Sequence, residues 1–471
     1  MVERNQEHPL LTTATAHDVL AALLSRGGDF AEVFVESVRG VSLSWEDRKL
    51  DEASSGRESG AGLRVVLSDE TYFANGNDLT REGLLRLAAG LASMLPEGGA
   101  SRTPPALTSE PARSVSSVEI EPGSVGMDAK IDLLERADRA ARGFDPRVAQ
   151  VNARYRDAER RIAVANSEGL LATDRVVYTT LVASVVARDG DLIRTAIKIA
   201  SGTRGFEIVA ENPPDGLARE AARVACLQLE AEPAPAGTFT VVLSSRAGGT
   251  MIHEACGHGL EGDFALNGLT VYAGKIGEKV ASTLVTVVDD GTIPGKRGSF
   301  GIDDEGTPSR RTVLIENGVL KGFLHSRRTA ALLGHEPTGN GRRESYRHLP
   351  IPRMRNTLIV PGGDAPEEIV ASVAEGILVA DMGGGEVDIV SGNFVFHCTE
   401  AYRIRDGRIA EPLRDAMLTG NGPDVLSRVD RVGRDLGYQV GTCGKDGQGV
   451  PVADAQPTIR VPGIVVGGLA R

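Results

Sequence analysis

The chain has 471 residues, with 41% hydrophobic and 4% aromatic content and a formal net charge of -12. Its length and apolar content predict two or three domains that bury sizeable cores. An acidic chain lacks the excess of lysine and arginine that neutralises phosphate groups. Outside a local basic groove, the composition therefore argues against nucleic acids and anionic membranes as partners.

The first half of the chain mixes helical and strand patterns. Periodic apolar residues and helix-ending glycines predict helices over 15–28, 79–95, 127–142 and 215–231. Thr15 is the expected cap of the first helix. Alternating apolar residues predict strands over 30–38, 61–67 and 71–74, and a β-meander over 147–210. The stretch 96–126, rich in Pro, Gly and Ser, is expected to be a long surface loop.

A boundary is predicted at the segment EAEPAPAG (230–237), where prolines alternate with small residues as in a semi-rigid connector. Beyond it, short strands and glycine turns dominate, after an opening strand FTVVLS and a short helix from about Gly248. We therefore expect an α+β protein. A mixed helix and antiparallel-sheet domain over 1–235 is followed by a β-rich domain over 236–471 that carries the short helix.

The chain shows neither a membrane-spanning run of about 18 apolar residues nor the basic start and apolar stretch of a secretory signal. Its four cysteines, Cys226, Cys256, Cys398 and Cys443, lie far apart. These features predict a cytoplasmic protein with reduced thiols. Each thiol is then either a small buried group, the commoner case, or a metal ligand.

The short helix contains MIHEACGHGLEGD (251–263), with His253, Glu254 and His258. Residues five apart on a regular helix differ by about 140° around its axis, so the two imidazoles would not converge on one ion. Gly257 and Gly259 offer a remedy, because glycine permits a widened turn or an early helix end. Two interpretations stay open: a metal site, or a helix end where His258 meets the last carbonyls and His253 is buried.

Other motifs point less clearly to chemistry. GLTVYAGKI has the wrong spacing for a phosphate-binding loop, and Ile276 stands where Ser or Thr must bind magnesium. DMGGGEVD is rich in glycine but opens no predicted helix. The serines Ser244, Ser245 and Ser391 lack the surroundings of a nucleophile elbow.

Seven motifs in one order carry a family resemblance. They are HEACGHGLEGD, TGNGRRES, PRMRNTLIVPGG, GNFVFHCTEAYRI, LTGNGPDVL, CGKDGQGVPV and QPTIRV, which together cover about residues 238–468. The chain resembles the TldD/PmbA family, and its TldD branch in particular. Upstream of these motifs, the likeness is one of order and length.

The resemblance implies a zinc-dependent peptidase that hydrolyses short or unfolded peptides in an enclosed site. By motif position, His253, His258 and Cys443 would be the metal ligands, on a short metal-binding helix and a later loop. Glu254 would be the catalytic carboxylate that activates a zinc-bound water. The PmbA (TldE) branch lacks the metal motif and pairs with the TldD type. The expected assembly is therefore a dimer, either with a PmbA-like subunit or with a second copy.

The implied set is chemically coherent. Two imidazoles and a thiolate leave the fourth zinc position open, as a hydrolase requires. Cys256, where the family more often has an aliphatic residue, is a rival thiol. Its ligation would draw all three ligands from one six-residue stretch, whereas Cys443 lies in a glycine-lined loop. Lys445 beside it would favour the thiolate. We expect Cys443 to be the ligand and Cys256 to be packed in the core.

Four further residues are candidates for contact with the substrate. Arg342 and Arg343 would clamp a peptide carboxylate, or else be solvated or salt-bridged. His325 and His397 would polarise the scissile carbonyl, or else be structural. The runner-up function is a catalytically silent subunit that binds peptides along a sheet edge or serves in assembly. The intact H-E-x-x-x-H motif favours the peptidase, because a silent subunit has no need of Glu254.

Overall fold

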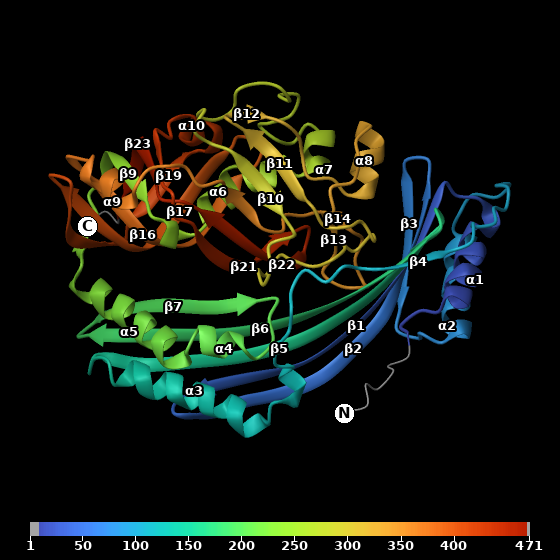
Figure 1. Cartoon of the computed structure of the whole chain (residues 1–471), viewed down its shortest axis with the longest axis horizontal. Coiled ribbons are helices and arrows are strands. Elements are labelled where there is room, and N and C mark those ends of the chain that lie inside the picture. Colours follow the sequence, from blue (N-terminus) through green and yellow to red (C-terminus); the bar gives the residue numbers. More distant parts are fainter. Residues whose placement is uncertain (1–8, 469–471) are drawn as a thin grey trace.

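The computed structural model describes residues 9–468 and confirms the α+β class (Figure 1). The first part of the chain is built on one long sheet, in which β3, β2, β1, β5 and β6 are successive antiparallel neighbours. Two strands share the far side of β6, β7 antiparallel and the short β4 parallel. The strands are β1 (Phe30–Glu46), β2 (Lys49–Leu67), β3 (Glu70–Gly76), β4 (Thr108–Pro111), β5 (Val148–Asn166), β6 (Leu170–Asp189) and β7 (Leu192–Gly202).

Two groups of helices cover one face of this curved sheet, and the second part of the chain lies against the other face (Figure 1). Side chains alternate accordingly along β1. Val33 and Val35 pack with the apolar residues of the helices α1 and α2, whereas Phe34 packs with Tyr346 of the second part. The helical elements are α1 (Thr13–Leu23), η1 (Leu24–Arg26), α2 (Arg81–Ser93), η2 (Pro122–Ser124), α3 (Met127–Arg142), α4 (Ile208–Glu211) and α5 (Pro214–Glu230).

Most predicted elements of this part are present. The helix predicted over 127–142 coincides with α3, and the meander corresponds to β5, β6 and β7. Thr15 does not cap the first helix: the side chain of Thr12 accepts the amide hydrogen of Thr15. β1 and β2 extend well beyond the apolar runs that predicted them, because they pair along their whole length. The predicted loop 96–126 contains β4 and η2.

The second part contains two larger sheets. One has the order β12-β11-β10-β15-β22-β21. In the other, pairing of β16 with both β9 and β17 closes β16, β9, β23, β19 and β17 into a ring. The strands are β8 (Glu232–Pro233), β9 (Gly237–Leu243), β10 (Val287–Asp290), β11 (Arg311–Glu316), β12 (Val319–Leu320), β13 (Gly341–Arg342), β14 (Ile351–Pro352), β15 (Thr357–Ile359), β16 (Glu375–Asp388), β17 (Asn393–Arg405), β18 (Arg408–Arg414), β19 (Met417–Asn421), β20 (Arg431–Val432), β21 (Gly437–Lys445), β22 (Gln448–Gln456) and β23 (Ile459–Gly467).

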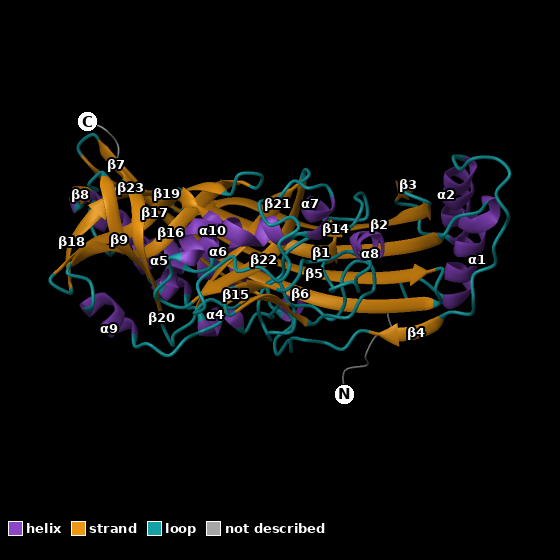
Figure 2. Cartoon of the chain, turned by 90° about the horizontal axis from the view of Figure 1, so that it is seen from above, coloured by secondary structure: helices purple, strands orange, loops and turns teal. Residues whose placement is uncertain are grey.

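Short helical elements connect these strands. They are η3 (Ser245–Ala247), α6 (Thr250–Ile252), η4 (His253–Gly257), η5 (His258–Leu260), α7 (Gly262–Leu266), α8 (Arg327–Leu333), α9 (Pro366–Ala371) and α10 (Gly422–Ser427). Seen from above, α1 and α2 lie at one end of the molecule and the ring of strands at the other (Figure 2). Between residues 9 and 468, no helix is both long and apolar enough to span a membrane.

Buried ion pairs join the two parts. Glu32 on β1 binds Arg64 of β2 at 2.7 Å and Arg343 of the second part at 2.5 Å. Arg64 also binds Glu305 of the second part at 2.8 Å. We propose 1–235 and 236–471 as the two domains, since every strand of the long sheet precedes Thr203 and, apart from the two-residue β8, the strands of the other sheets begin with β9 at Gly237.

Candidate metal centre and its cavity

The helix that carries the H-E-x-x-x-H motif is irregular. After the single turn of α6, η4 is a π-helical turn in which the amide of His258 bonds the carbonyl of His253. In a π-helical turn, the hydrogen bond joins an amide to the carbonyl five residues earlier. Two residues five apart therefore lie on the same side of the helix. The rings of His253 and His258 accordingly lie 4.9 Å apart between centroids and nearly perpendicular, at 87°. Of the two solutions that the glycines allow, a widened turn or an early helix end, the structure has the widened turn.

The glycines of the motif are needed for close packing. A Cβ added at Gly257 would lie 2.1 Å from the sulfur of the buried Met354, and one at Gly259 would lie 2.9 Å from the ring of Tyr272. Gly249, before α6, lies against β22, where a Cβ would come within 2.3 Å of the backbone nitrogen of Ala455. The motif helix is thus held between β22 on one side and Met354 and Tyr272 on the other.

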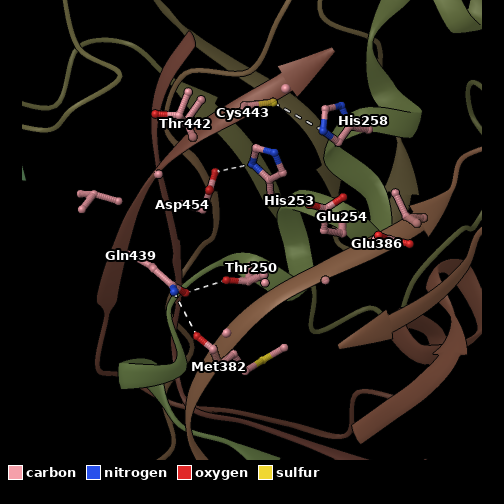
Figure 3. Close-up of a pocket in the computed structure, with 18 of the residues that line it drawn as sticks. Thr250, His253, Glu254, His258, Met382, Glu386, Gln439, Thr442, Cys443 and Asp454 are labelled. Atoms are coloured by element: carbon pink, nitrogen blue, oxygen red, sulfur yellow. Dashed lines mark hydrogen bonds and ion pairs between the residues drawn. The ribbon is translucent and has the colours of Figure 1, made fainter. Parts of the chain in front are cut away.

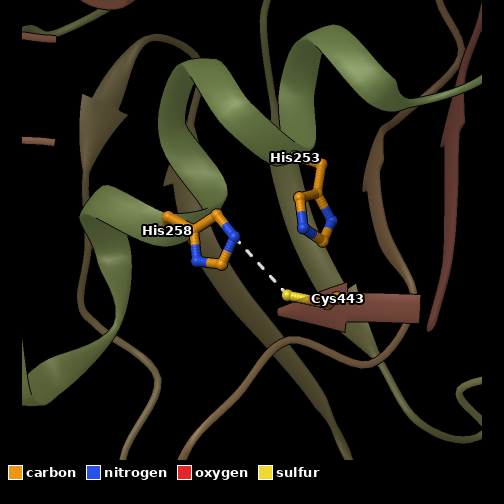
Figure 4. Close-up of side chains that lie close together, drawn as sticks. All are labelled: His253, His258 and Cys443. Carbon is orange, nitrogen blue, oxygen red and sulfur yellow. Dashed lines mark hydrogen bonds between the residues drawn. The ribbon is translucent and has the colours of Figure 1, made fainter. Parts of the chain in front are cut away.

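Cys443, which lies on the strand β21 and not in the predicted loop, completes a group of three possible metal ligands (Figure 4). Its sulfur lies 3.4 Å from Nε2 of His258, and one ligand atom from each of the three residues lies within 4.8 Å of the others. All three side chains are buried. Cys256 is not part of the group: its thiol faces the carbonyl of Ile252 at 3.5 Å, within the core.

Two carboxylates orient the imidazoles. Asp454 lies 2.9 Å from Nδ1 of His253, and Glu261 lies 3.0 Å from Nδ1 of His258. A carboxylate accepts a hydrogen from Nδ1, which leaves the lone pair on Nε2 for a metal. Lys445 donates to Glu261 at 3.0 Å and to Asp263 at 2.7 Å, so the buried Glu261 carboxylate has a fixed counter-charge.

The two carboxylates, Asp454 and Glu261, were not among the residues that the sequence singled out. Glu261 follows His258 by three residues, and that spacing is a signal that could have identified it. Asp454 has no such local signal, because it reaches His253 only through the β21–β22 hairpin. Lys445 was expected to favour the Cys443 thiolate, but its ammonium group is taken up by Glu261 and Asp263.

The electrostatics separate the two rival thiols. Burial raises the pKa of Cys443, but the hydrogen bonds and charges of His253 and His258 outweigh it and lower that pKa to about 5. Burial alone acts on Cys256 and raises its pKa far above the ordinary range. A thiolate is the form that binds metal. Near neutral pH, Cys443 is therefore the thiol that can act as a ligand.

The three residues line a cavity of about 1030 Å³ between the two parts of the chain (Figure 3). β7 of the first part contributes Ile197 and Ile199, and the second part contributes the motif helix, β16 and β21. Glu254 lines the same cavity. Burial raises its pKa, while the two histidines act in the opposite direction. Its carboxylate makes no hydrogen bond to any group within residues 9–468.

The remaining candidates lie outside this cavity. Arg342 bonds the carbonyls of Met354 and Pro451, and Arg343 bonds Glu32 and the carbonyl of Asp304. Both arginines are buried and do not line the cavity; Arg343 is salt-bridged to Glu32, whereas Arg342 donates to backbone carbonyls.

The other two candidate histidines, His325 and His397, lie apart from His253, His258 and Cys443, the three possible ligands that we call the metal group. His325 stacks on His335 at 5.1 Å, and burial, with the charge of His335, lowers its pKa to about 4. His397 is exposed on β17, two residues before Thr399, which does line the cavity. Neither histidine is itself a lining residue, so the structure brings together only His253, Glu254, His258 and Cys443 of the predicted site.

Family models match three stretches: PmbA/TldA metallopeptidase domain 1 at residues 31–95, the central domain at 120–229 and the C-terminal domain at 236–468. A metalloprotease TldD homolog of Haemophilus influenzae is 38% identical over 97% of both chains. A zinc metalloprotease TldD homolog of Saccharolobus solfataricus is 31% identical over 72% of this chain and 76% of its own.

Solved structures share the fold. A Thermotoga maritima protein described as a candidate modulator of a DNA gyrase superposes with a TM-score of 0.79 at 23% identity, covering 97% of this chain and all of its own. TldE from Thermococcus kodakarensis gives a TM-score of 0.75 at 20% identity, with 94% and 97% of the chains covered. Family models over most of the chain and relatives this similar place it plainly: the chain belongs to the PmbA/TldD family of metallopeptidases.

Proposed function

We propose that the chain is a zinc-dependent peptidase that hydrolyses short or unfolded peptides in the cavity between its two parts. The observation that carries this proposal is the convergence of His253, His258 and Cys443 beside Glu254 in that cavity. Two imidazole nitrogens and one thiolate form a donor set that suits zinc and leaves one position open. The name of the Saccharolobus solfataricus relative also supports zinc.

The donor set fits zinc in detail as well as in type. Asp454 and Glu261 occupy the Nδ1 atoms, so each imidazole presents Nε2 to the metal position. When bound, zinc would polarise the scissile carbonyl and lower the pKa of water. His253, His258 and Cys443 would hold it, and all three are fixed by buried backbone rather than by a surface loop.

Glu254 is the proposed general base. In the reaction, the water oxygen bonds to the carbonyl carbon and its proton passes to the Glu254 carboxylate. The carbon–nitrogen bond then breaks, and Glu254 returns the proton to the leaving amine. Burial raises the pKa of Glu254, which strengthens it as a base toward water. A carboxylate with no protein partner is also free to accept that proton.

The walls of the cavity suit an extended peptide. β16 pairs with β9 only as far as Val379, so from Gly383 to Glu386 one edge of β16 is unpaired and faces the cavity. An unpaired edge binds main-chain groups and is tolerant of side chains. Pockets for small ligands measure about 300–1,000 Å³, so a cavity near the top of that range admits a short segment and excludes a folded domain.

We further propose a cytoplasmic dimer, formed with a TldE-like subunit or with a second copy. The solved TldE chain has the same fold as this chain, and two subunits of one fold can form a pseudo-symmetric dimer. Ile193, Ile197 and Ile199 on the edge strand β7 are 52%, 55% and 45% exposed, and a partner would cover them beside the mouth of the cavity. The cytoplasmic location is supported by four cysteines that are all unpaired.

Glu254→Gln is expected to keep zinc but to lower peptide hydrolysis by at least about 10²-fold, because an amide cannot take the proton of water. Turnover of a fluorogenic peptide and zinc content of the same sample measure both. Near-normal turnover of the variant would show that a group other than Glu254 is the general base. Wild-type protein that neither holds nor takes up a transition metal would leave the silent peptide-binding subunit as the function.

Substitution of the two thiols should give opposite results. Wild-type protein is expected to hold about one zinc per chain. Cys443→Ala should abolish hydrolysis and weaken zinc binding, whereas Cys256→Ala should keep both and cost only about 1 kcal/mol of stability from lost packing. Zinc content by mass spectrometry distinguishes them. Loss of zinc in Cys256→Ala alone would contradict the ligand set.

Asp454→Asn tests the orientation of His253. An amide holds the ring less firmly in the required tautomer, so zinc affinity should fall by roughly 10- to 100-fold. Competition with a chromophoric chelator measures the affinity. Asp446→Asn is the matched control, because Asp446 is exposed at the same cavity and Asn tolerates its left-handed φ of 50°. Equal affinities in both variants would remove Asp454 from the centre.

The assembly is tested by light scattering of the purified chain, alone and mixed with a TldE-like subunit. We expect a dimer in at least one of these samples, because the exposed isoleucines of β7 need a cover. A chain that remains monomeric in both and hydrolyses peptides at full rate would show that the dimer is not needed.

A further inference from the structure

A second cavity of about 490 Å³ adjoins the first. The two share the lining residues Ile197, Ile199, Asp381, Gln439 and Val440, so an extended chain that leaves one cavity along β21 enters the other. The first cavity holds the metal group. The second has a different character, because four cations contribute to its lining: Lys198, Arg204, Arg246 and Lys296.

Three of these cations already have acidic partners. Lys198 binds Asp381, and Arg204 binds Glu211. Arg246 binds Glu400 at 3.0 Å and Glu220 at 3.2 Å. Their charges are therefore matched by protein groups and are not available to a ligand without breaking an ion pair.

Lys296 is different. Its Nζ lies 3.7 Å from the ring centroid of Tyr438 and forms no hydrogen bond or ion pair within the described part of the chain. The side chain is half-buried, and burial lowers its pKa, opposed only by the charge of Glu211. The ammonium group has lost part of its hydration and contacts the face of the Tyr438 ring. Its three N–H donors therefore remain available to an anion.

Its position fits the end of an extended peptide. Tyr438 and Cys443 are both on β21, five residues apart, which is about 16 Å at roughly 3.3 Å per residue. A peptide that reaches from the metal group to Lys296 thus spans about five residues. A carboxyl end bound at Lys296 would set the direction of the chain in the cavity.

We propose that Lys296 is the carboxylate-binding subsite of the substrate cavity and that it takes a peptide carboxylate about five residues beyond the scissile bond. The proposal rests on the proposed function, since it assigns the second cavity to the same peptide. A carboxylate there forms a charge-assisted hydrogen bond with Nζ in a partly desolvated site, where such bonds are strong.

The test measures binding of matched peptides to the Glu254→Gln variant, which does not consume them. One pair differs only in a free or amidated carboxyl terminus. A second pair, both amidated, carries Glu or Gln as the last residue, which separates a terminal carboxylate from an acidic side chain. We expect the carboxylate form of at least one pair to bind about 10-fold tighter, the factor given by about 1.5 kcal/mol for a hydrogen bond to a charged group.

Lys296→Gln in the same background should reduce that ratio to about one, without changing the affinity of the amidated or Gln-ended peptide. Lys296→Arg should retain the preference. Lys321→Gln is the control, since Lys321 is exposed, pairs with Glu316 and lines neither cavity. A preference that survives in Lys296→Gln, or equal binding of all four peptides to the parent, overturns the subsite.

The two proposals fail separately. Wild-type protein that hydrolyses no peptide, but whose Glu254→Gln form shows a carboxylate preference that Lys296→Gln removes, would keep the subsite and overturn the peptidase. Protein that hydrolyses peptides normally, with no preference between the members of either pair, would keep the peptidase and overturn the subsite.

Discussion

One backbone hydrogen bond, from the amide of His258 to the carbonyl of His253, sets the geometry on which the centre depends. In a regular α-helix this amide would bond the carbonyl of residue 254, and the two imidazoles would point in directions about 140° apart. The extra residue in the turn places both rings on one side, toward β21. A π-turn is a less stable arrangement than an α-turn, and it persists here because Met354, Tyr272 and β22 fill the space around it.

The shape of the cavity also depends on contacts between residues far apart in the sequence. The cavity lies between two parts of the chain, so its shape is only as constant as their relative position. Glu32, Arg64, Arg343 and Glu305 form a buried set of opposite charges across that junction. Removing one member of such a set leaves a buried charge without a partner, at a cost of about 3–5 kcal/mol. Arg343 therefore belongs to the junction rather than to the cavity.

What the sequence could predict follows from the range of the interactions involved. The spacing of the motif narrowed the local backbone to a widened turn or an early helix end, because two histidines five apart cannot face one ion on a regular helix. The helix α3 was predictable from its periodicity and its following glycine. The candidate role of Cys443 came from motif likeness; in the structure, His253 and His258 lie beside its thiol and lower its pKa.

Residues defined by tertiary contacts could not be found in this way. Asp454 meets His253 only because β22 folds back beside α6, and nothing near Asp454 in the sequence signals that meeting. Arg342 and Arg343 stand among glycines and charged residues in the sequence, which suggested exposed side chains that bind a carboxylate. In the structure both side chains are buried. Lys445 lies two residues from Cys443, so both side chains are on the same face of β21. The longer lysine side chain nevertheless has a different partner, because its ammonium group reaches Glu261.

The division of the cavity walls has a consequence for how such a protein diversifies. Every residue of the metal group and its carboxylate supports lies between 253 and 454, whereas Thr195, Ile197 and Ile199 come from the first part of the chain. The three candidate ligands and one wall of the cavity around them thus come from separate stretches of the sequence. Substitutions in β7 change the shape of the cavity without replacing a candidate ligand, so under the proposed function the range of substrates can change while the chemistry stays the same.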